Sequence, residues 1–478
     1  MLKYCFKGVY TEMMNRQQKQ HSRAFRRTLT VLTVCLCMIL GGLLIGCGAS
    51  QSSLDPQHPI TLSLWHIYGK NTDSPMNELV EEFNSTVGKE RGIIINTVNV
   101  SRVMDITPQL LDAFADTPGA LALPDLLFGH PSDVINTEPD RFLDWSELFT
   151  EEELSAYVDS FVEEGYVDEK LAVFPVSKSI NVTFVNANIF DKFAADTGCT
   201  YEDLATWEGL YETADAYYDW SGGKSFCSVD YIFHLLQSDA VSEGEAFIGD
   251  DNWLNFDCSS FRKGWLRFAE SAIRGRFKMA DPFSTTDMLC GDAVCGIGSS
   301  AAILYFGDEV IYPDNRREDL RLKILPPPYL AGSVPSVSQA GAGLAAIRSE
   351  DDTALSYAKG TVSDAKKEAC GIFAAWLTEP ARNLDFTVKT GYMPVTKEGF
   401  AAIADYDFPT SASRELHEVT AQVLEDYHFY IPAYVPGFDS RLNSLYQTMR
   451  GDLKDCRSRF DAGEDAEKLA RKSWEDMQ

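Results

Sequence analysis

A strand–helix–strand pattern between residues 60 and 98 constrains the fold of this chain more than any other feature. Ile60–Trp65 alternates apolar and polar residues with the period of two that is typical of a β-strand. Met76–Asn84 places its apolar side chains at intervals of three and four, which predicts an amphipathic helix. Ile93–Val98 is a second β-rich run. Two strands joined by one helix at this spacing predict a parallel pair with a right-handed crossover, so the first third of the chain is α/β.

Three later segments have the composition expected where a chain passes between two lobes. Leu171–Asn186 contains an apolar run, a proline, a polar pivot and a second β-rich run. Ile324–Gly343 is rich in proline, glycine and serine, and Thr390–Val395 is a shorter passage of the same kind. The sequence therefore predicts two compact lobes connected by several crossings.

The N-terminus has the features of an export signal. Arg23, Arg26 and Arg27 precede the apolar run 29–45, and the small residue Gly46 stands before Cys47. A basic head, an apolar centre and a small residue at the cleavage point are typical of a secretory signal peptide. The order also resembles the lipobox of bacterial lipoproteins, in which Cys47 would carry a diacylglyceryl group with palmitate-type chains and become the first mature residue. The alternatives are an ordinary cleaved signal or a membrane anchor, because a run of about 17 residues is at the lower limit for a spanning helix.

The remaining boundaries follow from composition and charge. Residues 1–46 are the predicted signal peptide, and residues 47–58, mostly small and polar, are a predicted flexible linker. The chain carries 71 acidic and 42 basic residues, a net charge of −29. Because the leader is basic, the mature part is still more acidic, which argues against binding to nucleic acid or to anionic head groups.

The cysteines argue against a metal site. The chain has 11 cysteines, and without the leader and Cys47 an odd set remains, so at least one thiol is unpaired or bonds another chain. Cys290 and Cys295 lack the paired spacing and histidine partners of a zinc site. We expect most of these residues to be buried small hydrophobes.

Seven segments, in order, resemble the bacterial extracellular solute-binding proteins of family 1, the sugar-type receptors of ABC importers. The resemblance spans about residues 60–470. The segments are Leu62–Tyr68, Phe83–Ile93, Glu151–Tyr157 with Glu164–Tyr166, Phe174–Ser179, Gly298–Ala301, Gly341–Leu344 and Thr390–Val395.

The resemblance implies an α/β fold of the type II periplasmic-binding-protein class, with two lobes and a ligand cleft between them. The N-terminal lobe would comprise residues 59–177 and 333–388, and the C-terminal lobe residues 178–332 and 389–478. It also implies a non-catalytic, lipid-anchored receptor on the extracellular face of the bacterial membrane. Its partners would be a mono- or oligosaccharide and the permease subunits of an ABC transporter, without any cofactor.

Sugar recognition needs flat aromatic faces and a few convergent polar groups in a concave site. In open α/β sheets a ligand lies beyond the carboxyl ends of the strands. Strand ends and crossings therefore select the ligand-binding candidates, which are Trp65, His66, Tyr68, Phe128, His130, Ser132, Lys178, Ser179, Ser299, Ser300, Tyr305 and Tyr392.

Several alternatives stay open at this point. Ser299 and Ser300 suit an anion at a helix start, or plain helix capping. Lys178 suits an anionic ligand or a hinge salt bridge. His66 and His130 lack the spacing of a metal pair, so no metal is predicted. A polyol phosphate, a peptide or a metal chelate is the alternative ligand.

Enzyme signatures are weak in this sequence. It contains no Gly-x-Ser-x-Gly elbow, Walker loop or His-Glu-x-x-His motif. The segment 296–301 approaches a dinucleotide fingerprint, but no clear βαβ unit surrounds it. Glycan hydrolysis needs only two carboxylates at a suitable distance, so a secreted glycan hydrolase is the alternative outside the binding proteins.

Overall fold

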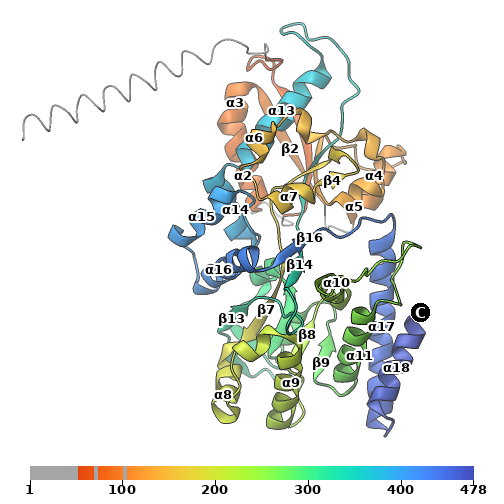
Figure 1. The fold of residues 1–478 in the computed structure, drawn as a ribbon. Coiled ribbons are helices and arrows are strands. Elements are labelled where there is room, and N and C mark those ends of the chain that lie inside the picture. The colour runs from red at the N-terminus through yellow and green to blue at the C-terminus, as the bar shows by residue number, and fades with distance from the viewer. Residues whose placement is uncertain (1–51, 69–73, 101–104) are drawn as a thin grey trace, which may run out of the picture.

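A computed structural model describes residues 52–68, 74–100 and 105–478. In these residues the chain forms two five-stranded sheets, which lie at opposite ends of the molecule and are flanked by helices (Figure 1). The signal peptide and Cys47 lie outside the described residues. The two sheets bear out the predicted two-lobed α/β class.

The N-lobe sheet is the upper one in Figure 1 and contains the predicted parallel pair. Its order is β2(Ile93–Asn99), β1(Ile60–His66), β3(Leu126–Gly129), β15(Gly343–Ala346) and β6(Val173–Phe174). β1 pairs in parallel with β2 and with β3, whereas β15 is antiparallel to β3 and β6. The chain thus returns to the first lobe after residue 342, at the end of the predicted crossing segment Ile324–Gly343.

The C-lobe sheet, lower in Figure 1, mixes strand directions in the same way. Its order is β13(Leu322–Leu325), β7(Asn181–Asn186), β10(Cys295–Ser299), β8(Cys227–Val229) and β9(Phe277–Met279). β10, β8 and β9 run parallel to one another, and β7 is antiparallel to β10 and β13. The carboxyl ends of β8, β9 and β10 therefore share one edge.

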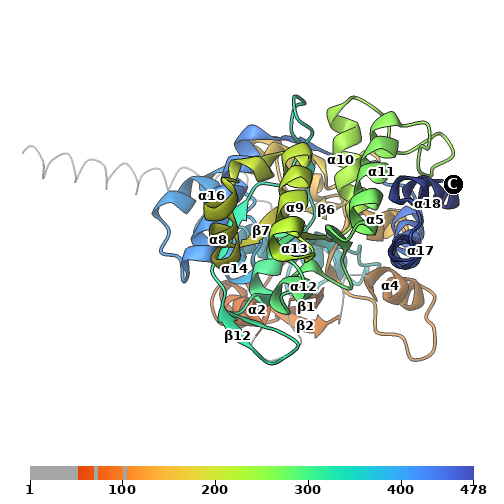
Figure 2. The same cartoon turned by 90° about the horizontal axis from the view of Figure 1, so that it is seen from below.

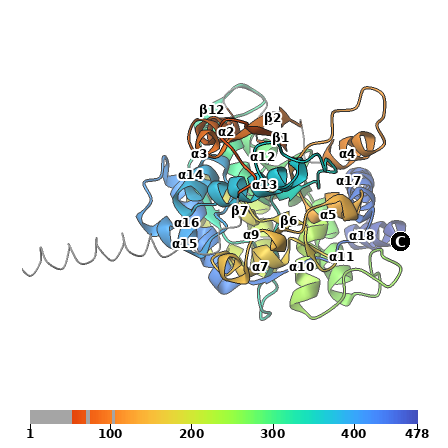
Figure 3. The ribbon, with the colours of Figure 1, turned by 90° about the horizontal axis from the view of Figure 1, so that it is seen from above.

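Helices cover both sheets, and Figures 2 and 3 show them from the C-lobe and N-lobe ends. The helices before the C-lobe sheet are α2(Pro75–Ser85), α3(Val87–Arg91), α4(Ile106–Phe114), α5(Pro131–Ile135), α6(Glu151–Leu154) and α7(Asp159–Glu163). The helices that connect the strands of the C-lobe sheet are α8(Ala187–Thr197), α9(Trp207–Ser221), α10(Ile232–Ser242), α11(Ser259–Ile273) and α12(Ser284–Leu289). The last are α13(Val362–Leu377), α14(Pro380–Thr390), α15(Lys397–Ala402), α16(Ser411–Asp426), α17(Phe438–Asp461) and α18(Ala466–Met477).

Short elements complete the fold. The 3₁₀ turns are η2(Pro139–Arg141), η3(Trp145–Glu147), η4(Glu202–Ala205), η5(Ser300–Tyr305) and η6(Ile403–Asp405). The two-stranded pairs are β4(Tyr166–Val167) with β5(Lys170–Leu171), β11(Glu309–Ile311) with β12(Arg317–Asp319), and β14(Ser336–Ser338) with β16(His428–Tyr430). α17 and α18 pack on α11, so the C-terminal helices belong structurally with the C-lobe sheet.

The three predicted crossing segments lie side by side. The backbones of Ser179 and Ala340 exchange two hydrogen bonds of 2.8 Å, and those of Lys178 and Met393 exchange bonds of 3.3 and 2.6 Å. One continuous apolar core passes through this region, because it joins N-lobe residues such as Leu64 to Phe184 of β7 and Ile324 of β13. The exact lobe boundaries at residues 177, 332 and 388 stay a prediction.

Residues 52–58 differ from a free linker. The Glu368 carboxylate accepts hydrogen bonds from the Ser52 hydroxyl at 2.6 Å and the Ser53 amide at 2.8 Å. The rings of His58 and Tyr357 stack at a centroid distance of 4.5 Å. A polar composition predicted flexibility, but the Glu368 carboxylate on α13 holds the start of this segment on the N-lobe.

The seven described cysteines are all free thiols. Five of them are buried, and Cys199 and Cys290 are half-buried. The expectation that most are small core residues is therefore confirmed for this part of the chain. Along the same residues, no helix combines the length and the apolar character needed to cross a bilayer.

Candidate functional site

The ends of the central strands carry most of the predicted ligand residues. Tyr68 follows β1 and His130 follows β3 in the N-lobe. In the C-lobe, β10 ends at Ser299 and β8 is followed by Asp230 and Tyr231. Since ligands of open α/β sheets lie beyond carboxyl strand ends, these two edges are the candidate site.

Tyr68 anchors an aromatic cluster beside the crossings. Its hydroxyl shares a 2.7 Å hydrogen bond with that of Ser177, and burial raises its pKa well above the usual value. Its ring meets Phe128, Phe386 and Tyr392 edge-on, at centroid distances of 4.9, 5.1 and 6.0 Å. The structure thus brings together three of the predicted residues, but Tyr68 and Phe128 are enclosed by the N-lobe core.

Trp65 and His66 also point into the N-lobe. Trp65 is 2% exposed and packs in an apolar core with Leu127 and Ala345. His66 is buried, which lowers its pKa, and its Nε2 lies 3.0 Å from Asn77 Oδ1. In this arrangement neither side chain offers a face to a ligand.

His130 and Ser132 lie at the start of α5 and are half-buried. Asp133 Oδ2 accepts the backbone N–H of His130 at 2.8 Å, and burial raises the Asp133 pKa. The charge of Asp439, at the start of α17, raises that pKa further. This end of the N-lobe therefore lies close to a helix that packs on the C-lobe.

Lys178 and Ser179 form the hinge rather than an open surface. The Lys178 ammonium makes an ion pair with Glu164, and the two side chains are 1% and 3% exposed. Ser179 is buried and pairs through its backbone with Ala340. Of the two alternatives for Lys178, the structure contains the hinge salt bridge.

The two serines after β10 behave differently from an anion site. The Ser299 hydroxyl accepts the N–H of Ala301 at 3.3 Å, which is a local cap. Ser300 is buried, and its N–H donates to the carbonyl of Ile180 in the first crossing. Ser299 caps the 3₁₀ helix η5 and Ser300 is its first residue, so the N–H groups of Ser300 and Ala301 are already committed to these contacts.

Tyr305 ends η5 and is 75% exposed. Burial and the neighbouring Tyr305 together raise the pKa of half-buried Tyr392 to about 12, so the two phenols lie close together. A Cβ on Gly391, where φ is +70°, would lie 2.7 Å from Ile303 Cγ2 and 3.0 Å from Ala301 Cα of η5. The C-lobe edge thus meets the third crossing at Tyr392.

Tyr231 is a site candidate that sequence reasoning missed. It is 42% exposed and adopts the left-handed conformation, with φ 44° and ψ 50°. Its ring stacks on His234 at 5.9 Å and 18°, and lies 5.9 Å from the ring of Tyr446. Left-handed backbone is costly for a bulky side chain, and such outliers concentrate at functional sites.

Asp230 supports Tyr231 from inside the lobe. It is buried, and its Oδ1 accepts the N–H of Ser284 at 2.6 Å. Burial raises its pKa to about 7. A Cβ on Gly298 would lie 2.4 Å from Asp230 Oδ2, so glycine in β10 leaves room for this carboxyl group.

The profile described as bacterial extracellular solute-binding protein matches residues 78–407, more than half of the chain. The chain belongs to this family. Its members are binding proteins that act outside the cytoplasm, and the match agrees with the resemblance drawn from the sequence.

Solved structures share the fold of this solute-binding protein. The cyclic alpha-maltosyl-1,6-maltose binding protein of Arthrobacter globiformis is 16% identical, with 88% of this chain and 99% of that chain covered and a TM-score of 0.61. The sugar-binding protein MalE of Xanthomonas citri is 16% identical (87% and 96% covered, TM-score 0.62). UgpB of Mycobacterium tuberculosis, in complex with glycerophosphocholine, is 16% identical (88% and 98% covered, TM-score 0.61). No curated protein matches the sequence.

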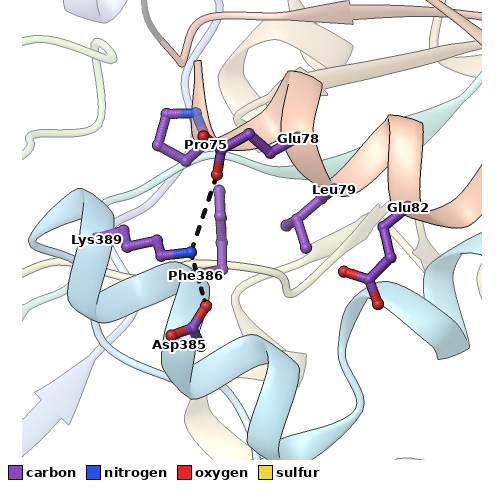
Figure 4. Close-up of a pocket in the computed structure, with 7 residues that line it drawn as sticks. All are labelled: Pro75, Glu78, Leu79, Glu82, Asp385, Phe386 and Lys389. Atoms are coloured by element: carbon purple, nitrogen blue, oxygen red, sulfur yellow. Dashed lines mark ion pairs between the residues drawn. The ribbon is translucent and has the colours of Figure 1, made fainter. Parts of the chain in front are cut away.

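Two surface pockets of the solute-binding protein lie away from these strand ends. One, of about 310 Å³, lies between α2 and α14, and its Lys389 ammonium is 3.0 Å from Asp385 and 3.9 Å from Glu78 (Figure 4). The other, of about 460 Å³, includes Arg348 and Lys366, which form ion pairs with Glu147 and Asp125. The charges of both pockets are largely neutralised locally, and neither contains a predicted ligand residue.

The described residues contain no group of three or more His, Cys, Asp or Glu side chains arranged to hold a metal ion.

One feature of the sequence points to Tyr231, which the sequence analysis did not select. Cys227–Val229 is a short β-prone run followed directly by an acid, an aromatic and a helix. The surrounding hundred or so residues are mainly helical, which hides this short strand and its end in the sequence pattern.

Proposed function

We propose that this solute-binding protein captures a mono- or oligosaccharide between its lobes and delivers it to the permease of an ABC importer. The observation that carries the proposal is the family match together with exposed aromatic rings at the carboxyl edge of the C-lobe sheet. Tyr231 and Tyr305 stand at that edge, and Tyr392 and the start of α5 lie on the side of the N-lobe and crossings.

Of the predicted residues, those with accessible surface are the best ligand contacts. They are His130, Ser132, Ser299, Tyr305 and Tyr392, to which Tyr231 is added. The aromatic members would stack on the apolar faces of a sugar, and the polar members would bind its hydroxyl groups. The predicted residues that are buried would support the strand ends from inside the protein. They include Trp65, His66, Phe128 and Lys178.

A sugar is favoured over the alternatives by the nature of the exposed groups. Two structures of the same fold are named for maltose-type or sugar ligands, while UgpB holds glycerophosphocholine. A phosphate would need a free cationic partner, and Lys178 is paired with Glu164. An uncharged ligand that is rich in hydroxyl groups needs no cationic partner.

Membrane attachment is part of the proposal. Cys47 would carry the lipid, and the lipidated protein would stand on the extracellular face of the membrane. The supporting observation is the basic, apolar and small-residue order that precedes Cys47.

The proposal is tested by a thermal-shift and tryptophan-fluorescence titration of the purified protein. The panel contains neutral mono- to tetrasaccharides, glycerol 3-phosphate and glycerophosphocholine. A ligand that binds only the folded state raises its melting temperature. A shift with a neutral sugar supports the proposal, and a shift confined to the two phosphate esters would replace the ligand class.

Bond cleavage separates a receptor from a glycan hydrolase. The same sugars are incubated with stoichiometric protein and analysed by chromatography. We expect each oligosaccharide to be recovered intact. Release of shorter sugars would contradict the receptor function.

A further inference from the structure

A short segment between β16 and α17 braces the two lobes against each other. We call residues 431–437 the strap; in Figure 1 it runs from the centre of the molecule to the top of α17. The helix that follows packs on the C-lobe, and its Tyr446 hydroxyl donates to the carbonyl of Ala280 at 3.1 Å. Movement of the C-lobe therefore moves the far end of the strap.

The first contact of the strap reaches the hinge. The Tyr434 hydroxyl donates to Glu164 Oε1 at 2.8 Å, while Glu164 Oε2 holds the Lys178 ammonium. Burial and the nearby carboxylate raise the Tyr434 pKa, so the hydroxyl keeps its proton and remains a donor. Glu164 precedes β4 in the N-lobe, and Lys178 is in the first crossing. One buried carboxylate thus links a crossing, the N-lobe and the strap.

The second contact lies at the other end of the strap. The N–H of Gly437 donates to Asn136 Oδ1, just beyond α5, at 2.8 Å. Pro436 restricts the backbone between the two contacts, and Pro432 restricts it just before Tyr434. A stiff segment held at Tyr434 and at Gly437 transmits a displacement of α17 to both hydrogen bonds.

Three aromatic side chains at the C-lobe edge are uncovered in the described arrangement. Tyr305 is 75% exposed, Phe283 is 48% exposed and Tyr231 is 42% exposed, although all three follow C-lobe strands at the candidate site. Closure of the lobes over a ligand would cover these side chains. Both strap bonds are formed in this arrangement, in which these side chains are uncovered.

We propose that the strap stabilises the open state through the Tyr434–Glu164 and Gly437–Asn136 hydrogen bonds, so that Tyr434 is a positioning residue for closure. The inference rests on the proposed closing motion and goes beyond it by naming what opposes it. A ligand must then supply enough differential binding to break both bonds.

The test uses the ligand-free full-length protein and the variants Tyr434→Phe, Asn136→Ala and the double variant. Dyes on non-natural amino acids at positions 90 and 219, exposed in α3 and α9, report lobe distance by single-molecule FRET. Loss of one hydrogen bond to a charged group changes an equilibrium by about tenfold or more. We expect Tyr434→Phe to raise the closed-to-open ratio about tenfold, and the double variant to raise it further.

Tyr201→Phe is the matched control, because the Tyr201 hydroxyl donates to Asp191 at 2.7 Å within the C-lobe. It should leave the lobe distance unchanged. An unchanged distance distribution in Tyr434→Phe and in the double variant, with only a lower melting temperature, would assign Tyr434 a purely structural role and overturn the proposal. A more open distribution would overturn it as well. Because no ligand is used, these outcomes are independent of the sugar titration.

Discussion

Tyr231 allows a direct test of whether the structure keeps a strained residue for binding. A left-handed backbone costs an L-residue with a side chain roughly 1–2 kcal/mol, which glycine avoids. At ordinary positions the order is reversed, because glycine is less stable than alanine by about 0.5–1 kcal/mol. The variants Tyr231→Ala and Tyr231→Gly lose the same ring contacts with His234 and Tyr446, so their difference isolates the backbone.

We therefore expect Tyr231→Gly to be more stable than Tyr231→Ala by about 1 kcal/mol, the reverse of the usual order. Urea unfolding followed by fluorescence measures this difference. Tyr166 in β4 is the control, since it is 38% exposed, and it is absent from the residues with positive φ. There alanine should be the more stable replacement.

The binding result completes the argument. If the strain serves ligand contact, both Tyr231 variants lose affinity for the sugar identified in the titration, by about tenfold for loss of one stacking ring. Equal stability of the alanine and glycine variants would refute the strain. Wild-type affinity in both variants would refute the role of Tyr231 in binding.

Three further outcomes follow from the structure. Burial raises the pKa of the Asp239 carboxyl to about 8. Its contribution to the free energy of unfolding is therefore present below about pH 4 and is lost as the pH rises to 8. Asp239→Asn should flatten this decline in stability, by at most about 1.4 kcal/mol per pH unit, as measured by urea unfolding at several pH values. Lys178→Met should destabilise the fold by about 3–5 kcal/mol because Glu164 is left unpaired, and the additional change Glu164→Leu should recover much of the loss, as measured by unfolding free energies. Cys47→Ser should move the protein from the membrane fraction to the medium and abolish labelling by radioactive palmitate, and labelling of the variant would place the lipid elsewhere.

The fold was largely predictable because its signals are local. The alternation of Ile60–Trp65 is the burial pattern of β1, in which Leu62 and Leu64 are fully enclosed. The helix and strand that follow obey the same periodicity. The composition of Ile324–Gly343 indicated a crossing back to the N-lobe, but the pairing of β15 with β3 joins residues more than 200 positions apart, and no window of sequence gives that partner.

The site was less predictable because a position at the end of a strand tells where a side chain starts but not which way it points. Trp65 and Tyr68 are three residues apart at the end of one strand, yet their rings enter different apolar cores of the N-lobe. Tyr231 was missed because its distinctive property is a backbone angle. Sequence shows which residue types are present, whereas the φ of Tyr231 is a property of the folded junction between β8 and α10.

The energetics of Lys178 bear on the choice between a sugar and an anionic ligand. A ligand phosphate at Lys178 would have to replace Glu164 as the partner of an ammonium group that is 1% exposed. That exchange leaves the Glu164 carboxylate buried without a counter-charge, at a cost of about 3–5 kcal/mol, which corresponds to a loss of more than a hundredfold in affinity. A neutral sugar at the exposed rings of Tyr231 and Tyr305 avoids this cost and leaves the hinge pair intact. The hinge salt bridge therefore favours an uncharged ligand. Because Glu164→Leu also removes the acceptor of the Tyr434 hydroxyl, Lys178→Met combined with Glu164→Leu should favour closure and keep sugar binding, whereas loss of the Tyr231 ring should weaken it about tenfold.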